Sequence, residues 1–235
     1  MQKNIFDEFA DSYDELLDEA VRVSGFKPSY FHEYKIIELY NYLKSSGLDQ
    51  KKISLLNYGC GTGSSEKYIK KYLPNVSIFS IDISEESIRV AKKENESFSD
   101  IVFETFDGVN IRFDRKFDII FIANVFHHIS RAQQYKSMKA INSKVSDSGF
   151  LMMFEHNPIN PLTLWVAYHS DYKFDKEAKL LHPLYCRKLL NESGFKKRMI
   201  RFIVFFPGFL MCLNKFEKYL HKLPIGAQYY YIARK

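Results

Sequence analysis

Short runs of apolar residues alternate along the chain with stretches in which apolar residues recur at every third or fourth position. The apolar runs predict strands near residues 53–58, 76–82, 101–104, 117–123 and 149–155. The periodic stretches predict helices near residues 64–72, 85–95, 133–146 and 183–193. Two more strands are predicted near the C-terminus, over residues 196–206 and 228–234. Strands that alternate with helices pair in parallel and are covered on both faces, so the pattern predicts an α/β fold.

The region before the first strand is predicted to be helical. Apolar residues recur at helical spacing from Phe6 to Leu17, with acids between them, which predicts an amphipathic leading helix. A second helix is expected over residues 30–46, and its buried side should carry Phe31, Tyr34, Ile37 and Tyr40 or Leu43. We expect residues 1–50 to form a helical cap.

One apolar segment interrupts the last two strands. Residues 202–213 are intensely apolar, but the run is too short to cross a bilayer and is broken at Pro207 and Gly208. Its second half has apolar residues at helical spacing next to lysines, so we expect residues 207–224 to be an inserted amphipathic helical segment. Such a helix can cover the core, bind a lipid-like acceptor or lie on a membrane surface.

Size and composition favour one domain over residues 1–235. With 235 residues and 46% hydrophobic side chains, the chain can bury one substantial core. The three cysteines are odd in number and lack metal-binding spacing, which is typical of a reducing compartment. The first twenty residues are acidic and lack the apolar core of a secretion signal. We therefore expect a cytoplasmic protein with free thiols and no metal site.

The net charge of +6 is unevenly distributed. Residues 185–235 contain eleven Lys and Arg residues against two acids, whereas the first twenty residues contain seven acids and one lysine. The basic region can favour an anionic substrate, a phosphate-bearing lipid or an acidic membrane surface, and it can equally be a solvated lysine face.

The segment from Leu55 to Gly63 carries the strongest functional signal. It is an apolar strand that runs directly into three glycines spaced G-x-G-x-G, with Cys60 and Thr62 between them, and a helix pattern follows. Residues without a Cβ atom allow positive φ and let a ligand approach the backbone closely. A dinucleotide-binding turn needs G-x-G-x-x-G, but here the third glycine comes one residue early. This spacing is evidence against the alternative hypothesis of a nicotinamide-dependent oxidoreductase. About twenty residues later Asp82 ends the next strand, where a carboxylate can accept from two ribose hydroxyls.

This order of motifs resembles the class I, Rossmann-like, methyltransferases that use S-adenosylmethionine (SAM). The resemblance implies a seven-stranded, mostly parallel sheet that ends in an antiparallel hairpin, with helices on both faces. It also implies roles for ten residues in binding SAM. Gly59, Cys60, Gly61 and Gly63 would form the methionine pocket, Asp82 would bind ribose, Phe106, Asp107 and Ile83 would hold adenine, Tyr13 would cover the cofactor, and Asn124 would form the floor.

Methyl transfer from a sulfonium mainly requires alignment of the nucleophile and removal of its proton. Open α/β sheets collect ligands at the C-terminal ends of their strands, where His127 follows the fourth strand and Glu155 and His156 end the fifth. His156 is the leading general base, because the ordinary pKa of histidine is about 6.5. Each histidine can instead make a structural hydrogen bond.

The run E-H-N-P-I-N-P-L-T, residues 155–163, resembles a bacterial methyltransferase subgroup associated with surface-polysaccharide and lipid-linked sugar pathways. It implies a small-molecule or lipid-linked acceptor, such as a sugar, that is methylated at oxygen. The alternative is a non-catalytic SAM-binding or membrane-associated scaffold. A nucleic-acid substrate is disfavoured, because the residues after the fourth strand, Asn124 to His127, lack the proline-containing signature of amino-directed nucleic-acid methyltransferases.

Overall fold

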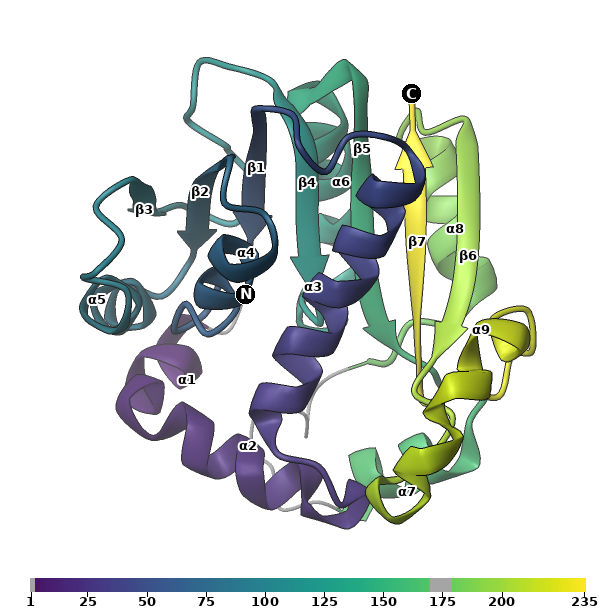
Figure 1. Ribbon diagram of the computed structural model, residues 1–235. Helices are drawn as coiled ribbons and strands as arrows, with labels where there is room; N and C mark the ends of the chain where they lie inside the picture. Colours follow the sequence, from purple (N-terminus) through teal and green to yellow (C-terminus); the bar gives the residue numbers. More distant parts are fainter. Residues whose placement is uncertain (1–2, 170–178) are drawn as a thin grey trace.

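The computed structural model describes residues 3–169 and 179–235 (Figure 1). Its centre is a seven-stranded sheet with the order β3-β2-β1-β4-β5-β7-β6. The strands are β1 Ile53–Tyr58, β2 Val76–Asp82, β3 Ile101–Thr105, β4 Phe117–Ala123, β5 Val145–His156, β6 Lys197–Ile203 and β7 Gln228–Arg234. Strands β1 to β5 pair in parallel, and β7 runs antiparallel to both β5 and β6. The predicted sheet and its terminal hairpin are confirmed.

The helices that cover the sheet are α3 Pro28–Ser45, α4 Glu66–Tyr72, α5 Glu85–Glu94, α6 Arg131–Lys144 and α8 Pro183–Glu192. Successive residues of β4 point to opposite faces, as the pleat of a strand requires. Ile120 and Ile122 pack in the cluster that contains α6 and α8, whereas Ile119 and Phe121 pack in the cluster that contains α3 and α4. Both faces of the central strand are therefore buried, which explains why its sequence is a continuous apolar run.

The N-terminal region is helical but broken. It consists of α1 Lys3–Glu8, a 3-10 turn at Ala10–Ser12, α2 Tyr13–Val21 and a second 3-10 turn at Arg22–Ser24. Figure 1 shows α1 and α2 at the end of the sheet toward which the parallel strands point. The cap therefore lies at the edge where open α/β sheets collect their ligands.

The buried face of α3 differs from the predicted one. Its buried residues are Pro28, Lys35, Ile36, Leu39 and Leu43, so only Leu43 of the predicted side is buried, while Phe31, Tyr34, Ile37 and Tyr40 are partly buried. Aromatic residues are frequent on both sides of this helix, so its periodicity alone did not fix which side faces the sheet. The buried face that the structure shows includes a lysine, Lys35.

Helix α7, Pro161–His169, was not predicted. Pro158 and Pro161 follow β5 closely, a composition that is typical of a loop. Pro161 is instead the first residue of the helix, where its missing N–H costs nothing. Strand β5 also begins four residues earlier than predicted, at Val145, across Gly149 and polar residues that weaken the apolar signal.

The segment inserted between β6 and β7 is helical, but it is not one continuous amphipathic helix. It contains a 3-10 helix, η4 Gly208–Phe216, with non-helical angles at Leu210, and a single turn, α9 Glu217–Leu220. No residue of η4 is buried, and Phe209 is 83% exposed. The segment therefore lies on the surface of the core. Among the described residues, no helix is both long and apolar enough to cross a membrane.

The insert is anchored through Glu217. This residue is buried, and its two carboxylate oxygens accept hydrogen bonds from the Tyr34 hydroxyl at 2.7 Å and from the Phe205 N–H at 2.6 Å. One side chain thus joins the insert to α3 and to the end of β6.

We predict that Glu217→Ala lowers the free energy of unfolding by about 1–3 kcal/mol, because it leaves two partly buried donors without their acceptor. Glu192→Ala is the matched control. Glu192 is exposed, and its Oε1 lies 3.8 Å from Lys188 Nζ, which makes a weak surface ion pair. Its loss should therefore change the free energy of unfolding by less than about 0.5 kcal/mol. Urea denaturation measures both values, and equal losses in the two variants would contradict the anchoring role.

Candidate active site

The glycine turn after β1 is fixed by close packing on both sides. Gly59 has φ +76°, and a Cβ there would lie 2.5 Å from the side chain of Val125. Gly63 has φ +74°, and a Cβ there would lie 2.9 Å from the Cβ of Ala91 on α5. At Gly61 a Cβ would meet no atom within 4 Å. The outer two glycines therefore let the turn fit between its neighbours, and the middle one borders open space.

A buried polar group supports the turn from below. Glu66, at the start of α4, is fully buried, and its Oε1 accepts from Asn57 Nδ2 at 2.8 Å and from the Ser80 hydroxyl at 2.6 Å. Asn57 belongs to β1 and Ser80 to β2. Burial raises the pKa of Glu66, and these two donors act against the shift. The carboxyl group thus ties both strands to the helix that follows the turn.

Asp82 joins the turn to the end of β2. Its Oδ2 accepts from the Gly61 N–H at 2.9 Å, and its Oδ1 accepts from the Ser84 N–H at 3.0 Å. Burial raises the pKa of Asp82, and the backbone donors of Ser84, Gly61 and Ile83 act against the shift. Each carboxylate oxygen can accept a further hydrogen bond, so the group can hold a ligand while it fixes the turn.

A cavity of about 290 Å³ lies at this edge of the sheet. Gly59, Cys60, Gly61, Asp82, Ile83 and Phe106 line it, together with Asn124, His127 and His156. It therefore brings together nine of the thirteen residues that the sequence analysis proposed for the site. Burial raises the pKa of the Cys60 thiol well above its usual value, which makes a reactive thiolate unfavourable.

Four predicted residues have other positions. Gly63 packs against α5 and does not line the cavity. Asp107 is exposed, and its carboxylate accepts from the N–H groups of Val109 and Asn110, which lowers its pKa. Glu155 lies behind the cavity wall, hydrogen-bonded to His127. The side chain of Tyr13 lies outside the described part of the structure, so its role in covering the cofactor stays a prediction.

The polar end of the cavity is built on a buried carboxylate. Glu155 is fully buried at the end of β5, where its Oε1 accepts from the Phe126 N–H at 2.9 Å and its Oε2 lies 2.6 Å from His127 Nδ1. A carboxylate so close favours the tautomer in which Nδ1 donates, so Nε2 is the ring atom that can accept a proton. The 3-10 turn η3, Phe126–His128, presents this histidine to the cavity.

Two more histidine rings lie next to His127. The ring of His128 is 4.1 Å away between centroids, and the ring of His156 is 5.3 Å away. Phe6 of the cap packs edge-on against His128 at 5.3 Å. Within residues 3–169 and 179–235, no group of three or more His, Cys, Asp or Glu side chains is arranged to hold a metal ion.

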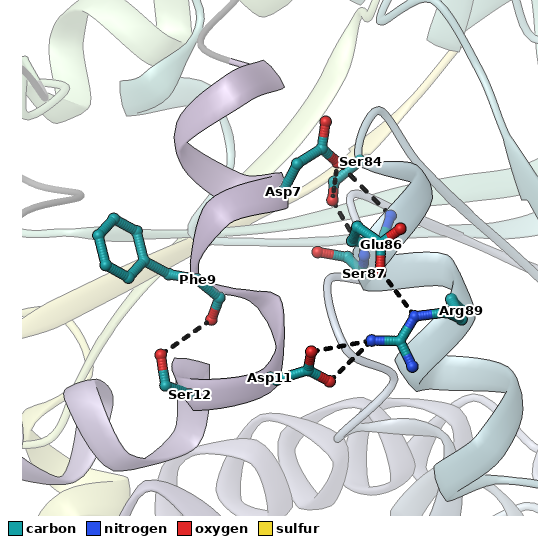
Figure 2. A network of polar contacts seen from close by, with 8 residues as sticks. All are labelled: Asp7, Phe9, Asp11, Ser12, Ser84, Glu86, Ser87 and Arg89. Atoms are coloured by element: carbon teal, nitrogen blue, oxygen red, sulfur yellow. Dashed lines mark hydrogen bonds and ion pairs between the residues drawn. The ribbon is translucent and has the colours of Figure 1, made fainter.

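The cap is attached to α5 by acids (Figure 2). Asp7 accepts from the hydroxyl of Ser84, the N-cap residue of α5, at 2.7 Å. Asp11 accepts from Arg89 Nη2 at 2.8 and 2.9 Å. Phe6, Leu17 and Val21 of the cap line the cavity. The acidic residues of the first helices therefore position an apolar cover above the glycine turn.

Sequence reasoning missed several residues of the cavity wall. They include His32 and Lys35 on α3, and Leu162, Thr163 and Val166 on α7. Lys35 lies one turn after Phe31 and one turn before Leu39, but the periodicity of this helix does not fix which of its sides is buried. The α7 residues could not be found from the sequence, because that helix was itself not predicted.

The residues of the cavity fit an amino-acid-bearing nucleoside. Gly61 leaves open space at the turn, and Asp82 retains acceptor capacity for hydroxyl groups. Asn124 has φ +58°, and its buried Oδ1 has no hydrogen-bond partner within the described residues, so it can accept from a polar ligand group. Ile83 and Phe106 add apolar surface suited to a planar base.

Comparison with known proteins agrees with this geometry. The family model "Methyltransferase domain" matches residues 56–151, which contain the glycine turn, Asp82 and the end of β4. A malonyl-acyl-carrier-protein O-methyltransferase of Bacillus cereus is 24% identical over 162 residues, which are 68% of this chain. The alignment covers 54% of that relative, so the chain spans about half of its length.

Solved structures show the same fold. A SAM-dependent methyltransferase from Thermotoga maritima superposes with a TM-score of 0.68 at 15% identity, and the match covers 100% of both chains. The magnesium protoporphyrin IX methyltransferase of Synechocystis, with bound S-adenosylhomocysteine (SAH), superposes with a TM-score of 0.66 at 15% identity, again over 100% of both chains. Residues 56–151 thus match a methyltransferase domain, and the chain has the fold of methyltransferases whose cofactor is SAM.

We predict that Asp82→Ala weakens SAH binding at least about tenfold, because charge-assisted hydrogen bonds to ribose contribute about 1.5–3 kcal/mol each. Asp82→Asn keeps the size of the side chain, so it separates the loss of charge from disturbance of the turn. Isothermal titration calorimetry measures affinity, and circular dichroism verifies the fold.

Asp147→Ala, at an exposed site remote from the cavity, is the control and should bind SAH as tightly as the native protein. Unchanged affinity in both Asp82 variants would refute the ribose assignment. The same titration of Asp107→Ala tests whether that carboxylate contacts adenine, as the sequence predicted.

Proposed function

We propose that the protein transfers a methyl group from SAM to an oxygen atom of a small or lipid-linked acceptor, such as a sugar. The observation that carries this proposal is the Glu155–His127 pair, which lies at the wall of the cavity that the glycine turn and Asp82 also border. The cavity thus contains a group able to accept a proton beside residues suited to hold the methyl donor.

When bound, SAM supplies a methyl group on positively charged sulfur. The acceptor oxygen forms the new bond to that carbon while the carbon–sulfur bond breaks, and its electron pair stays on sulfur. His127 Nε2 takes the hydroxyl proton as the bond forms. Glu155 holds the ring in the competent tautomer and stabilises the imidazolium, so it acts as a positioning residue. His156 lines the same cavity and is the second candidate base.

A second surface supports a lipid-linked acceptor. Exposed apolar side chains gather on α7, on the insert and on the loop that precedes β7: Ile159, Leu162, Trp165, Phe209, Met211, Phe216, Tyr219, Leu223 and Ile225. Hydrogen bonds from Asn157 and Thr163 to the backbone of residues 224–227 hold α7 against that loop. Lys215, Lys218 and Lys222 lie beside the apolar residues of the insert. Apolar anchors flanked by lysines suit the surface of an anionic membrane.

We predict that His127→Gln and Glu155→Gln lower the rate of methyl transfer by about 100-fold or more while SAH affinity changes less than about threefold, because general base catalysis contributes about 10²–10⁴. Transfer from radiolabelled SAM into a bacterial lipid and sugar extract measures the rate. His182→Gln, an exposed histidine outside the cavity wall, is the control and should retain activity.

Full activity in the His127 variant would exclude it as the base, and the same assay on His156→Gln would then test the second candidate. SAH binding by the native protein without transfer to any fraction would favour the non-catalytic SAM-binding scaffold.

We predict that Phe209→Ser combined with Tyr219→Ser reduces binding to phosphatidylglycerol vesicles about tenfold or more, since burying one such side chain contributes about 1.5–3 kcal/mol. Vesicle co-sedimentation measures the binding. High salt should also weaken vesicle binding, because the lysines attract the anionic lipids electrostatically. Tyr135→Ser, at an exposed position of α6, is the matched control. Equal vesicle binding by the double variant and the native protein would contradict the proposed membrane contact.

A further inference from the structure

Lys35 is a buried cation at the wall of the cavity. Its side chain belongs to the buried face of α3, and the residue is 5% exposed. Its hydrogen bond is a long one, 3.5 Å from Nζ to the Phe31 carbonyl in the preceding turn of the same helix. No carboxylate of the described residues forms an ion pair with it. A buried ammonium without a paired anion is costly, so its retention in a ligand cavity points to a ligand that pairs with it.

The lysine remains a cation near neutral pH. Burial lowers the pKa of Lys35 to about 8, and the charge of Glu155 acts against this shift. Glu155 is not its ion-pair partner among the described residues, since its two oxygens accept from His127 and from the Phe126 N–H and neither contacts the Lys35 ammonium. The Glu155 carboxylate is therefore already hydrogen-bonded to two donors, whereas the Lys35 ammonium has no paired anion among the described residues.

The position of Lys35 along α3 separates it from the glycine turn. His32, about one turn earlier, has its Nδ1 3.4 Å from the Ser65 hydroxyl, directly after the glycine turn. Lys35 lies about one turn farther along the helix, and Glu155 at the end of β5 acts on its charge. Lys35, His127 and His156 line the same cavity, in which the acceptor must meet the methyl group.

The methyl donor increases the need for an anion. Its sulfonium brings a positive charge into the cavity that holds the Lys35 ammonium, and two cations in a poorly solvated space repel each other. An acceptor with an anionic oxygen group would compensate both charges. Leu162, Val166, Leu180 and Val204 complete this wall with apolar surface.

We propose that Lys35 binds an anionic oxygen group, a carboxylate or a phosphate, of the methyl acceptor, and that the acceptor has an apolar body. This inference rests on the proposed methyltransferase function and narrows its substrate class. It makes Lys35 a specificity-determining residue of the acceptor site.

The test is calorimetric titration of the full chain, saturated with SAH, with three probes that share an apolar tail: octanoate, octyl phosphate and the uncharged octanamide. The native protein should bind at least one anionic probe about tenfold or more tightly than octanamide, because a charge-assisted hydrogen bond is worth about that factor or more. The preferred anion shows whether the site suits a carboxylate or a phosphate.

Lys35→Met should abolish the preference for the anion, and Lys35→Arg, which keeps the charge, should retain it. Lys44→Met, at an exposed position of the same helix, is the matched control and should behave like the native protein. Removal of an unpaired buried charge should not lower the thermal unfolding midpoint, which verifies that the Lys35→Met variant is folded.

Two results would overturn the proposal. One is equal binding of charged and uncharged probes by the native protein. The other is a tenfold or greater loss of SAH affinity in Lys35→Met without any probe present, which would assign the lysine to the carboxylate of the donor. Failure of the proposed function looks different, because then the native protein would either not bind SAH or would bind it without transferring methyl groups.

Discussion

The packing of the glycine turn between two neighbours is the constraint on which the site depends. Gly59 has no room for a Cβ because Val125, just after β4, occupies that space, and Gly63 has none because Ala91 of α5 does. The backbone of the turn is therefore fixed between the ends of β1 and β4 and the helix that follows β2. Gly61 remains open toward the cavity, and its N–H is held by Asp82. The close packing at Gly59 and Gly63 holds the turn in place, so the backbone at Gly61 can border open space for a ligand.

Much of the fold could be predicted because its signals are local. All seven strands were predicted within a few residues, apart from the early start of β5, since runs buried on both faces are continuously apolar. The site depends more on contacts between distant residues. Glu155 bonds His127, and the Asp107 carboxylate accepts from the backbone of its own turn. The spacing of residues along the sequence does not reveal either contact, because both depend on three-dimensional packing. Lys35 was missed for a related reason, because the aromatic residues around α3 obscured which side of the helix is buried.

The charges of the molecule have separate structural roles. Two acids of the first helices, Asp7 and Asp11, hold the cap against α5. Each of these contacts is partly exposed and contributes modestly, so the cap is attached by several weak interactions rather than by a large buried core. A cover attached in this way can open for exchange of cofactor without disturbing the sheet.

The buried charges at the other end of the cavity act differently, because they lie where water cannot screen them. Glu155 is costly to bury and is compensated by two donors, one of which is the histidine that it orients. Lys35 has no such compensation within the described residues. Under the proposed function, this cation without an ion-pair partner shares the cavity with His127 and with a positively charged methyl donor. An arrangement of this kind is stable with an anionic acceptor in place and is least favourable with the donor alone, so electrostatics can couple occupancy by the donor to arrival of the acceptor.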